Sequence, residues 1–195
     1  GGFVATSDKR IKNMIGLSNP ESDLCILNKI QITDYTYIDK INNSATPQKK
    51  VIAQQLQEVY PQAVNTNTGI IPNVFDVAST TKIDNNKTII TTSMPHSFKS
   101  GDKVKLIVEN TGEKLVEVSV IDPTTFSVHE TINDKIFVYG KQVDDLLNVD
   151  YDAVSMLNVS ATQALSRQLE ALKKENEALK EEINNRLTMI EMNMG

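Results

Sequence analysis

The sequence predicts an α+β fold with short N-terminal elements, a β-rich middle and a long C-terminal helix. Near the N-terminus, apolar residues recur at helical spacing at Ile11, Met14 and Ile15. Residues 65–142 contain short runs rich in Val, Ile and Thr, separated by turn residues, which is typical of strands. The last 45 residues carry apolar side chains every three or four positions, the a/d pattern of a coiled coil.

Several short elements are expected before residue 65. A helix is expected over Lys9–Ile15, because Gly16 follows it at a C-cap position. A second short helix is expected around residues 24–30, and residues 31–38, rich in Ile, Thr and Tyr, predict a strand. A third helix is expected to end at Pro61, since proline cannot continue a helix.

The β-rich middle predicts a small sandwich or barrel, because several short strands follow one another at close spacing. Gly101-Asp102 and Asn110-Thr111-Gly112 separate them as turns. Strands are expected at residues 82–84, 88–91, 103–108, 115–120 and 126–128.

The C-terminal helix predicts self-association. Its apolar seam comprises Leu165, Leu169, Leu172, Asn176, Leu179 and Ile183. Asn176 takes an a position, where a buried amide costs stability but specifies register. After Ile183 the spacing shifts to Leu187, Ile190 and Met194, which indicates a stutter in the heptad pattern. A single amphipathic helix packed on its own domain is the alternative, but a narrow seam of roughly 30 residues exceeds what a small core can cover. The pattern leaves the number of strands open.

Composition excludes several classes of protein. The 195 residues carry a net charge of −5, which disfavours a nucleic-acid or anionic-membrane partner. No apolar stretch reaches the length of a membrane span. The single cysteine, Cys25, excludes an internal disulfide framework and a cysteine metal cage, and its apolar surroundings predict a buried, inert thiol. We expect no metal and no cofactor.

Ser7 and Lys12 are the candidate catalytic pair. A serine hydroxyl becomes a nucleophile when a base takes its proton, and a neutral lysine can be that base. Residues five apart do not share a helix face, so Ser7 must lie before the helix and Lys12 must fold back toward it. The alternative is that Ser7 or Asp8 caps the helix and Lys12 is a solvated side chain.

Four segments in order resemble the C-terminal self-cleaving chaperone domain of phage tail spikes and fibres, the endosialidase-type intramolecular chaperone. The first segment matches the family's Ser-Asp-x-Arg-x-Lys-x-x-Ile pattern at every fixed position. The four segments are Ser7 to Ile15, Asp34 to Tyr37, Val51 to Val64 and Val149 to Val154. A shorter stretch within residues 96–128 is similar to small β modules of tail-fibre proteins.

The resemblance implies a self-cleaving serine peptidase that acts once, in cis, between Thr6 and Ser7. Ser7 would be the nucleophile and Lys12 the general base, whose pKa must then fall from about 10.4 through burial or a neighbouring cation. Asp8 would hold the helix start. Arg10 would supply part of the neighbouring charge and orient the turn.

The resemblance also implies partners, a location and a domain order. The expected partners are two further copies in a homotrimeric coiled coil and the upstream β-fibre of the same polypeptide. Assembly is expected in the cytoplasm of the producing cell, with the parent fibre on the virion or cell surface. The expected parts are the fibre end (residues 1–6), a small mixed chaperone domain in two pieces (7–64 and 143–160), an all-β insertion (65–142) and the coiled-coil helix (161–195).

Two alternatives stay open at this point. The first is a non-cleaving trimeric fibre tip or adhesin cap, with a β insertion that binds a receptor. The second is an unrelated enzyme that uses His96, which with His129 makes up the histidines of the chain. Solvated or hydrogen-bonded strand histidines are the default interpretation of both.

Overall fold

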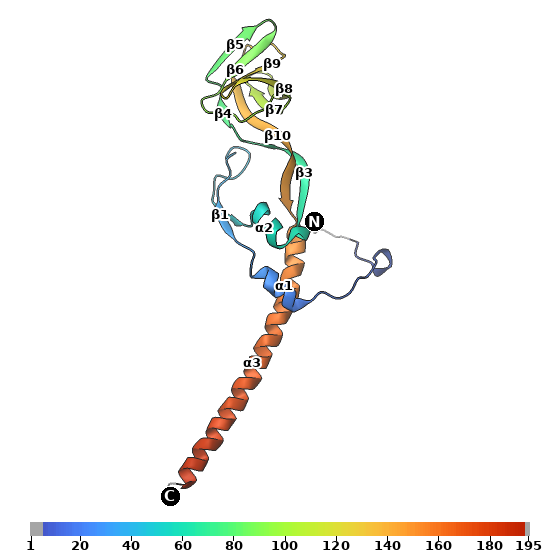
Figure 1. The fold of residues 1–195 in the computed structure, drawn as a ribbon, viewed down its shortest axis with the longest axis vertical. Helices are drawn as coiled ribbons and strands as arrows, with labels where there is room; N and C mark the ends of the chain where they lie inside the picture. Colours follow the sequence, from blue (N-terminus) through green and yellow to red (C-terminus); the bar gives the residue numbers. More distant parts are fainter. Residues whose placement is uncertain (1–5, 194–195) are drawn as a thin grey trace. The chain divides into compact units, whose positions relative to one another are not determined.

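Helices and strands are both present in the computed structural model, which describes residues 6–193 (Figure 1). The predicted mixture of helix and sheet and the long C-terminal helix are therefore confirmed. The chain divides into two compact units. One unit is built from the residues up to Ile30 together with those from Tyr151 onward, and the other comprises Gln31–Asp150.

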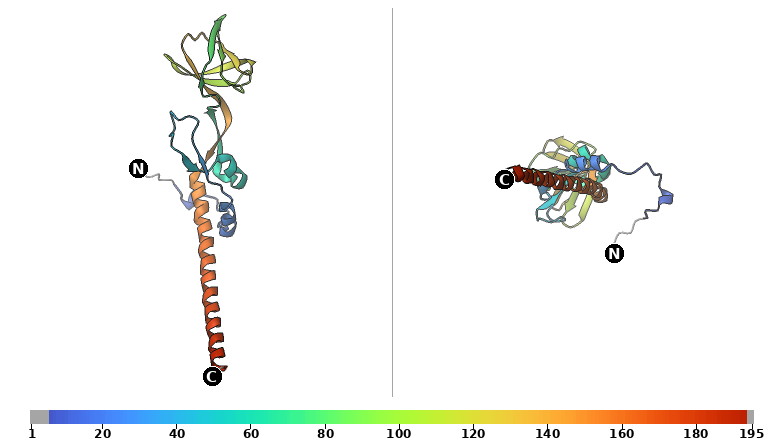
Figure 2. Two further views of the ribbon diagram at one scale, coloured as in Figure 1. Left: turned by 90° about the vertical axis from the view of Figure 1, so that its left-hand side faces the viewer. Right: turned by 90° about the horizontal axis from the view of Figure 1, so that it is seen from below.

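The first unit holds a short 3₁₀ helix, η1 (Lys9–Ile11), and two α-helices, α1 (Pro20–Leu27) and α3 (Tyr151–Asn193). The α1 helix begins at Asn19, whose side-chain oxygen accepts hydrogen bonds from the first turn, and proline occupies the next position. Leu24 packs against Ala161 and Ala164 of α3, and all three are buried. The small alanines let α1 lie alongside α3 (Figure 2). No helix within residues 6–193 is long and apolar enough to span a membrane.

Two predictions for this unit are wrong. The helix expected over Lys9–Ile15 is only the three-residue η1, because a short helix needs packing on its apolar face and Ile11, Met14 and Ile15 are exposed. Cys25 is exposed instead of buried. Its neighbour Leu24 faces α3, and successive helix residues point in different directions.

The second unit begins with a small hairpin and a helix. The strands β1 (Thr33–Tyr35) and β2 (Gln48–Lys50) pair antiparallel, and α2 (Ala53–Val59) and the 3₁₀ helix η2 (Pro61–Ala63) follow. The helix predicted before Pro61 is confirmed, and the strand predicted within residues 31–38 is present but shorter. The helix predicted around residues 24–30 is present as α1, but it begins earlier, at Pro20, and ends at Leu27. Leu56 and Ala63 are buried, and Thr33 Oγ1 donates a hydrogen bond to Gln55 Oε1 at 3.0 Å.

An eight-stranded antiparallel sheet forms most of the second unit, and it contains all five strands predicted for the middle of the chain. The order along the sheet is β3-β10-β7-β8-β9-β6-β5, with β4 beside β10. The bounds are β3 (Val64–Ile71), β4 (Asp76–Val77), β5 (Thr80–Asp84), β6 (Lys87–Thr91), β7 (Lys103–Val108), β8 (Gly112–Asp122), β9 (Thr125–Val128) and β10 (Ile136–Val149).

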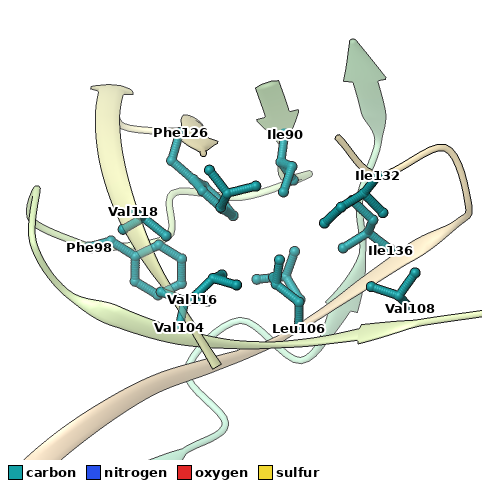
Figure 3. Close-up of a cluster of buried hydrophobic side chains, with 12 residues drawn as sticks. Ile90, Phe98, Val104, Leu106, Val108, Val116, Val118, Phe126, Ile132 and Ile136 are labelled. Atoms are coloured by element: carbon teal, nitrogen blue, oxygen red, sulfur yellow. The ribbon is translucent and has the colours of Figure 1, made fainter. Parts of the chain in front are cut away.

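The curled part of this sheet encloses the main hydrophobic core (Figure 3). Alternate residues of its strands point inward, as in the buried Val104, Leu106 and Val108 of β7. The core comprises Ile90, Phe98, Val104, Leu106, Val108, Val116, Val118, Phe126, Val128, Ile132, Ile136 and Val138.

The long strand β10 was not predicted from the sequence. Its first half, from Ile136, pairs with β7 and β4, and its second half, up to Val149, pairs with β3 (Figure 1). The second half is rich in polar residues, including Asp144 and Asp145, so its sequence lacks the pattern that is typical of a strand. The register with β7 shifts between Val138 and Gly140, at the point where β10 changes partner.

We predict that Gly140→Ala destabilises the protein by about 2–4 kcal/mol. Gly140 has a φ of +155°, and a β-carbon there would lie 2.0 Å from the Ile71 carbonyl oxygen. Urea unfolding followed by circular dichroism measures the loss. Gly16→Ala is the matched control, because no atom lies within 4 Å of a β-carbon at that position. Equal stability of the two variants would show that β3 can move away from position 140.

Candidate functional site

Ser7 and Lys12 come together across η1. Ser7 precedes the 3₁₀ turn and Lys12 follows it, and Lys12 Nζ donates a hydrogen bond to Ser7 Oγ at 2.5 Å. The turn is closed by bonds from Ile11 N to Asp8 O at 3.3 Å and from Lys12 N to Lys9 O at 3.1 Å. An α-helix would separate side chains five apart, so the tighter turn followed by extended backbone at Lys12 is what allows the contact.

Asp8 and Arg10 hold this turn. The Asp8 carboxylate caps η1 by accepting the Arg10 backbone N–H at 2.8 Å. The Arg10 guanidinium also binds it with two nitrogens, Nη2 at 2.6 Å and Nε at 3.1 Å. The hydrogen bonds from Arg10 lower the pKa of Asp8 below its usual range. Two opposite charges in contact largely cancel at longer range, so the pair acts mainly by orienting the turn.

The site lies open in this single chain. Thr6, Ser7 and Lys12 are all exposed, and Thr6 contributes the carbonyl adjacent to Ser7. Residues 1–5 of the expected fibre end lie outside the described residues. A hydroxyl within hydrogen-bonding reach of an amine is the arrangement that nucleophilic catalysis by a serine requires.

Apolar side chains flank the site without being covered by this chain. Ile11, Met14, Ile15 and Leu17 are all more than half exposed, and the last two are fully exposed. Four large apolar residues within seven positions form an unusual surface for a solvated segment. This segment, residues 11–17, has the composition of a contact surface.

The two histidines lie in the β-rich unit, and their surroundings differ. His96 is buried in the β-rich sheet, where its ring stacks on Phe98 with centroids 4.6 Å apart and contacts the edge of Phe126 at 5.3 Å. Its Nδ1 accepts a hydrogen bond from Phe98 N at 2.9 Å. His96 is therefore a core residue, whereas His129 is exposed at the end of β9. Among residues 6–193, no three His, Cys, Asp or Glu side chains gather as metal ligands.

Asp39 was not predicted as a functional residue. It is a buried carboxylate on the loop between β1 and β2, and Tyr139 Oη donates to it at 2.8 Å. A sequence signal existed in the aspartate three residues before Asn42, a spacing typical of turns closed by an aspartate side chain. The sequence around its partner Tyr139, on β10, contains no comparable pattern.

A comparison with known protein families finds a match to the part of the chain that contains this site. Residues 7–65 match the family model Peptidase_S74, described as chaperone of endosialidase. The match confirms the resemblance inferred from the sequence, and its name indicates a domain of the serine peptidase type. It covers the first third of the chain and includes both Ser7 and Lys12. No curated protein matches the chain.

We predict that Arg10→Gln raises the pKa of the Asp8 carboxyl toward its ordinary value. The arginine lowers that pKa in the wild type, so the neutral glutamine should remove much of the effect. A carbon-detected NMR titration of the side-chain carboxyls measures the change. Arg167→Gln, which removes the distant partner of Glu21, should leave Asp8 unaffected. An Asp8 titration that is identical in all three proteins would contradict the Asp8–Arg10 pairing.

Proposed function

Because residues 7–65 match the endosialidase chaperone family, we propose that this chain is a C-terminal intramolecular chaperone that releases itself by autoproteolysis. Three copies associate, assist the folding of an upstream β-fibre, and then cleave the bond between Thr6 and Ser7. The observation that carries the proposal is the contact between Lys12 Nζ and Ser7 Oγ within the matched segment.

The proposed reaction begins with a shift of the acyl group from nitrogen to oxygen. Lys12 takes the Ser7 hydroxyl proton, and Ser7 Oγ attacks the Thr6 carbonyl carbon. The Thr6–Ser7 carbon–nitrogen bond then breaks, and Lys12 returns its proton to the Ser7 nitrogen. Water hydrolyses the resulting ester, which leaves a carboxylate on Thr6 and a new N-terminus at Ser7.

Assembly would bury the exposed site and so favour the neutral lysine that the proposed reaction needs. Lys12 must be neutral to act as a base, and burial is the general way in which a protein favours a neutral lysine. The exposed segment of residues 11–17 lies directly beside the pair, so packing this segment against another copy would cover Ser7 and Lys12. Cleavage would then follow assembly, because the catalytic pair would be activated only in the trimer.

The C-terminal helix supports association. Its seam residues Leu165, Leu169, Leu172, Leu179, Ile183, Leu187 and Ile190 are each 49–55% exposed in the single chain. They recur every three or four positions and form one stripe along the helix, as expected for a helix whose partners are other helices. Asn176 interrupts this stripe, and its side-chain amide donates to the Leu172 carbonyl at 2.9 Å. The last predicted seam residue, Met194, lies outside the described residues.

A trimerising chaperone fits the physical problem of folding a β-fibre. Three chains must come into register before distant contacts repay the entropy lost, so nucleation is slow. A helical bundle forms from local contacts and raises the effective concentration of the attached chains. Later cleavage removes this aid, so the folded fibre is protected kinetically against unfolding. The proposal places assembly in the cytoplasm of the producing cell, on a tail spike or fibre of a phage, without a nucleic-acid or membrane partner.

We predict that Ser7→Ala and Lys12→Ala each abolish cleavage in a longer chain that carries its upstream fibre. The first removes the nucleophile and the second removes the base. Lys12→Arg should not restore cleavage, because arginine does not release its proton in proteins. Mass spectrometry of purified protein detects the new N-terminus at Ser7, and light scattering checks that the variants still assemble.

These measurements test the base, the nucleophile and the occurrence of cleavage separately. Rapid cleavage of the Lys12→Arg protein at neutral pH would show that Lys12 is not the base. Cleavage at another bond, or of the Ser7→Ala protein, would exclude Ser7 as the nucleophile. An intact wild-type chain in fully assembled samples would instead favour the non-cleaving fibre tip.

We predict that Leu172→Asp combined with Leu179→Asp converts the assembly to monomers at micromolar concentration. Association would force several carboxylates into an apolar seam, where charges without partners are costly. Analytical ultracentrifugation measures the mass. Met189→Asp is the control, because Met189 is exposed on the same helix but lies outside the seam. A wild-type monomer, or a trimer that survives both aspartates, would contradict the coiled-coil assignment.

A further inference from the structure

A buried carboxylate connects the loop after β1 to β10. Asp39 is only 2% exposed, although its sequence neighbours are exposed. Its Oδ1 accepts the backbone N–H groups of Ile41 and Asn42, each at 3.0 Å. Its Oδ2 accepts Asn42 Nδ2 and Tyr139 Oη, each at 2.8 Å. A buried charge persists only with such a set of donors, so all four bonds matter to the loop.

One of these bonds differs in kind from the other three. The bonds from Ile41 and Asn42 are local and form a turn closed by the aspartate side chain. The bond from Tyr139 spans 100 residues of sequence and exists only when β10 is in place. Chiefly through the Asn42 backbone N–H, these donors lower the pKa of Asp39 to about 2. Burial, and then Asp39, raises the pKa of Tyr139 to about 12.

The sheet fixes Tyr139 from its other sides. Phe75 contacts the tyrosine ring edge-on at 5.5 Å and donates its backbone N–H to Tyr139 O at 3.0 Å. Lys105 Nζ lies 4.7 Å from the ring centroid and pairs with Glu113 Oε1 at 2.6 Å. Phe75 has a φ of +49°, which is strained for a bulky residue and requires support from its surroundings. The hydroxyl is therefore directed at Asp39 by strands β7, β8 and β10 together.

We propose that the Asp39–Tyr139 bond is a latch through which the folded sheet orders the hairpin of β1 and β2. Each of these strands has three residues, and an isolated hairpin of that length is unstable in water. The latch, a charged acceptor with a directed donor, supplies a long-range contact to the loop that joins them. The hairpin lies within the matched residues 7–65, whereas Tyr139 lies far outside them. In this proposal, the β-rich sheet orders part of the matched segment through a single long-range bond.

Tyr139→Phe tests the latch, because it keeps the ring and removes the hydroxyl. Hydrogen exchange followed residue by residue by NMR should show the amides of Ile41, Asn42 and the β1–β2 hairpin exchanging about tenfold faster, as expected for loss of a bond to a charged group. The amides of Leu106 and other core strand residues should exchange as in the wild type. Tyr151→Phe, at an exposed position on α3, should change neither set.

Asp39→Asn removes the charge and one acceptor oxygen on the loop side, so it weakens the local bonds from Ile41 and Asn42 together with the bond from Tyr139. If Tyr139→Phe does not fold, the amides of β1 and β2, which lie away from the local bonds, decide the result: they should exchange faster in Asp39→Asn while the core strands stay protected. Unchanged exchange in the hairpin of either folded variant would overturn the latch. Equal acceleration in the hairpin and the core strands would also overturn it, since the bond would then support the whole sheet.

Discussion

The pairing of β10 with two different neighbours is the interaction on which the second unit depends. Its first half completes the curled sheet beside β7, and its second half forms a ribbon with β3. The change of partner requires Gly140, because its backbone conformation and the nearby Ile71 carbonyl leave no room for a side chain. The strand β10 therefore runs from the core shown in Figure 3 into the two-stranded ribbon with β3, and this ribbon contacts α2.

At the candidate site, a local turn brings the two side chains of interest together. Asp8 closes a 3₁₀ turn and binds Arg10, and the chain then leaves the turn in an extended conformation that directs Lys12 back to Ser7. The contact thus arises within six consecutive residues. A site of this kind can be carried at the start of a chaperone domain without depending on distant strands. The exposure of the site in one chain fits the proposal that cleavage follows assembly.

Much apolar surface remains uncovered in the described part of the single chain. Two stretches of it are the segment of residues 11–17, which contains Lys12 of the candidate pair, and the stripe along α3. Soluble monomers rarely keep such continuous apolar surface. The proposed trimer accounts for both surfaces with one assembly, and it connects association to the chemistry of Ser7 and Lys12.

The sequence by itself determined the features that depend on local pattern. The helical period of α3, the alternation in strands such as β7, and the Ser7-to-Lys12 motif were all predicted correctly as elements or as a family resemblance. The domain boundaries and the catalytic roles remain predictions. Tertiary structure decided the rest. The expected helix at Lys9–Ile15 failed because nothing in the described part of the chain packs on its apolar side chains, and Cys25 became exposed because Leu24 faces α3. The strand β10 and the Asp39–Tyr139 bond depend on pairings between distant residues, which no local pattern in the sequence indicates.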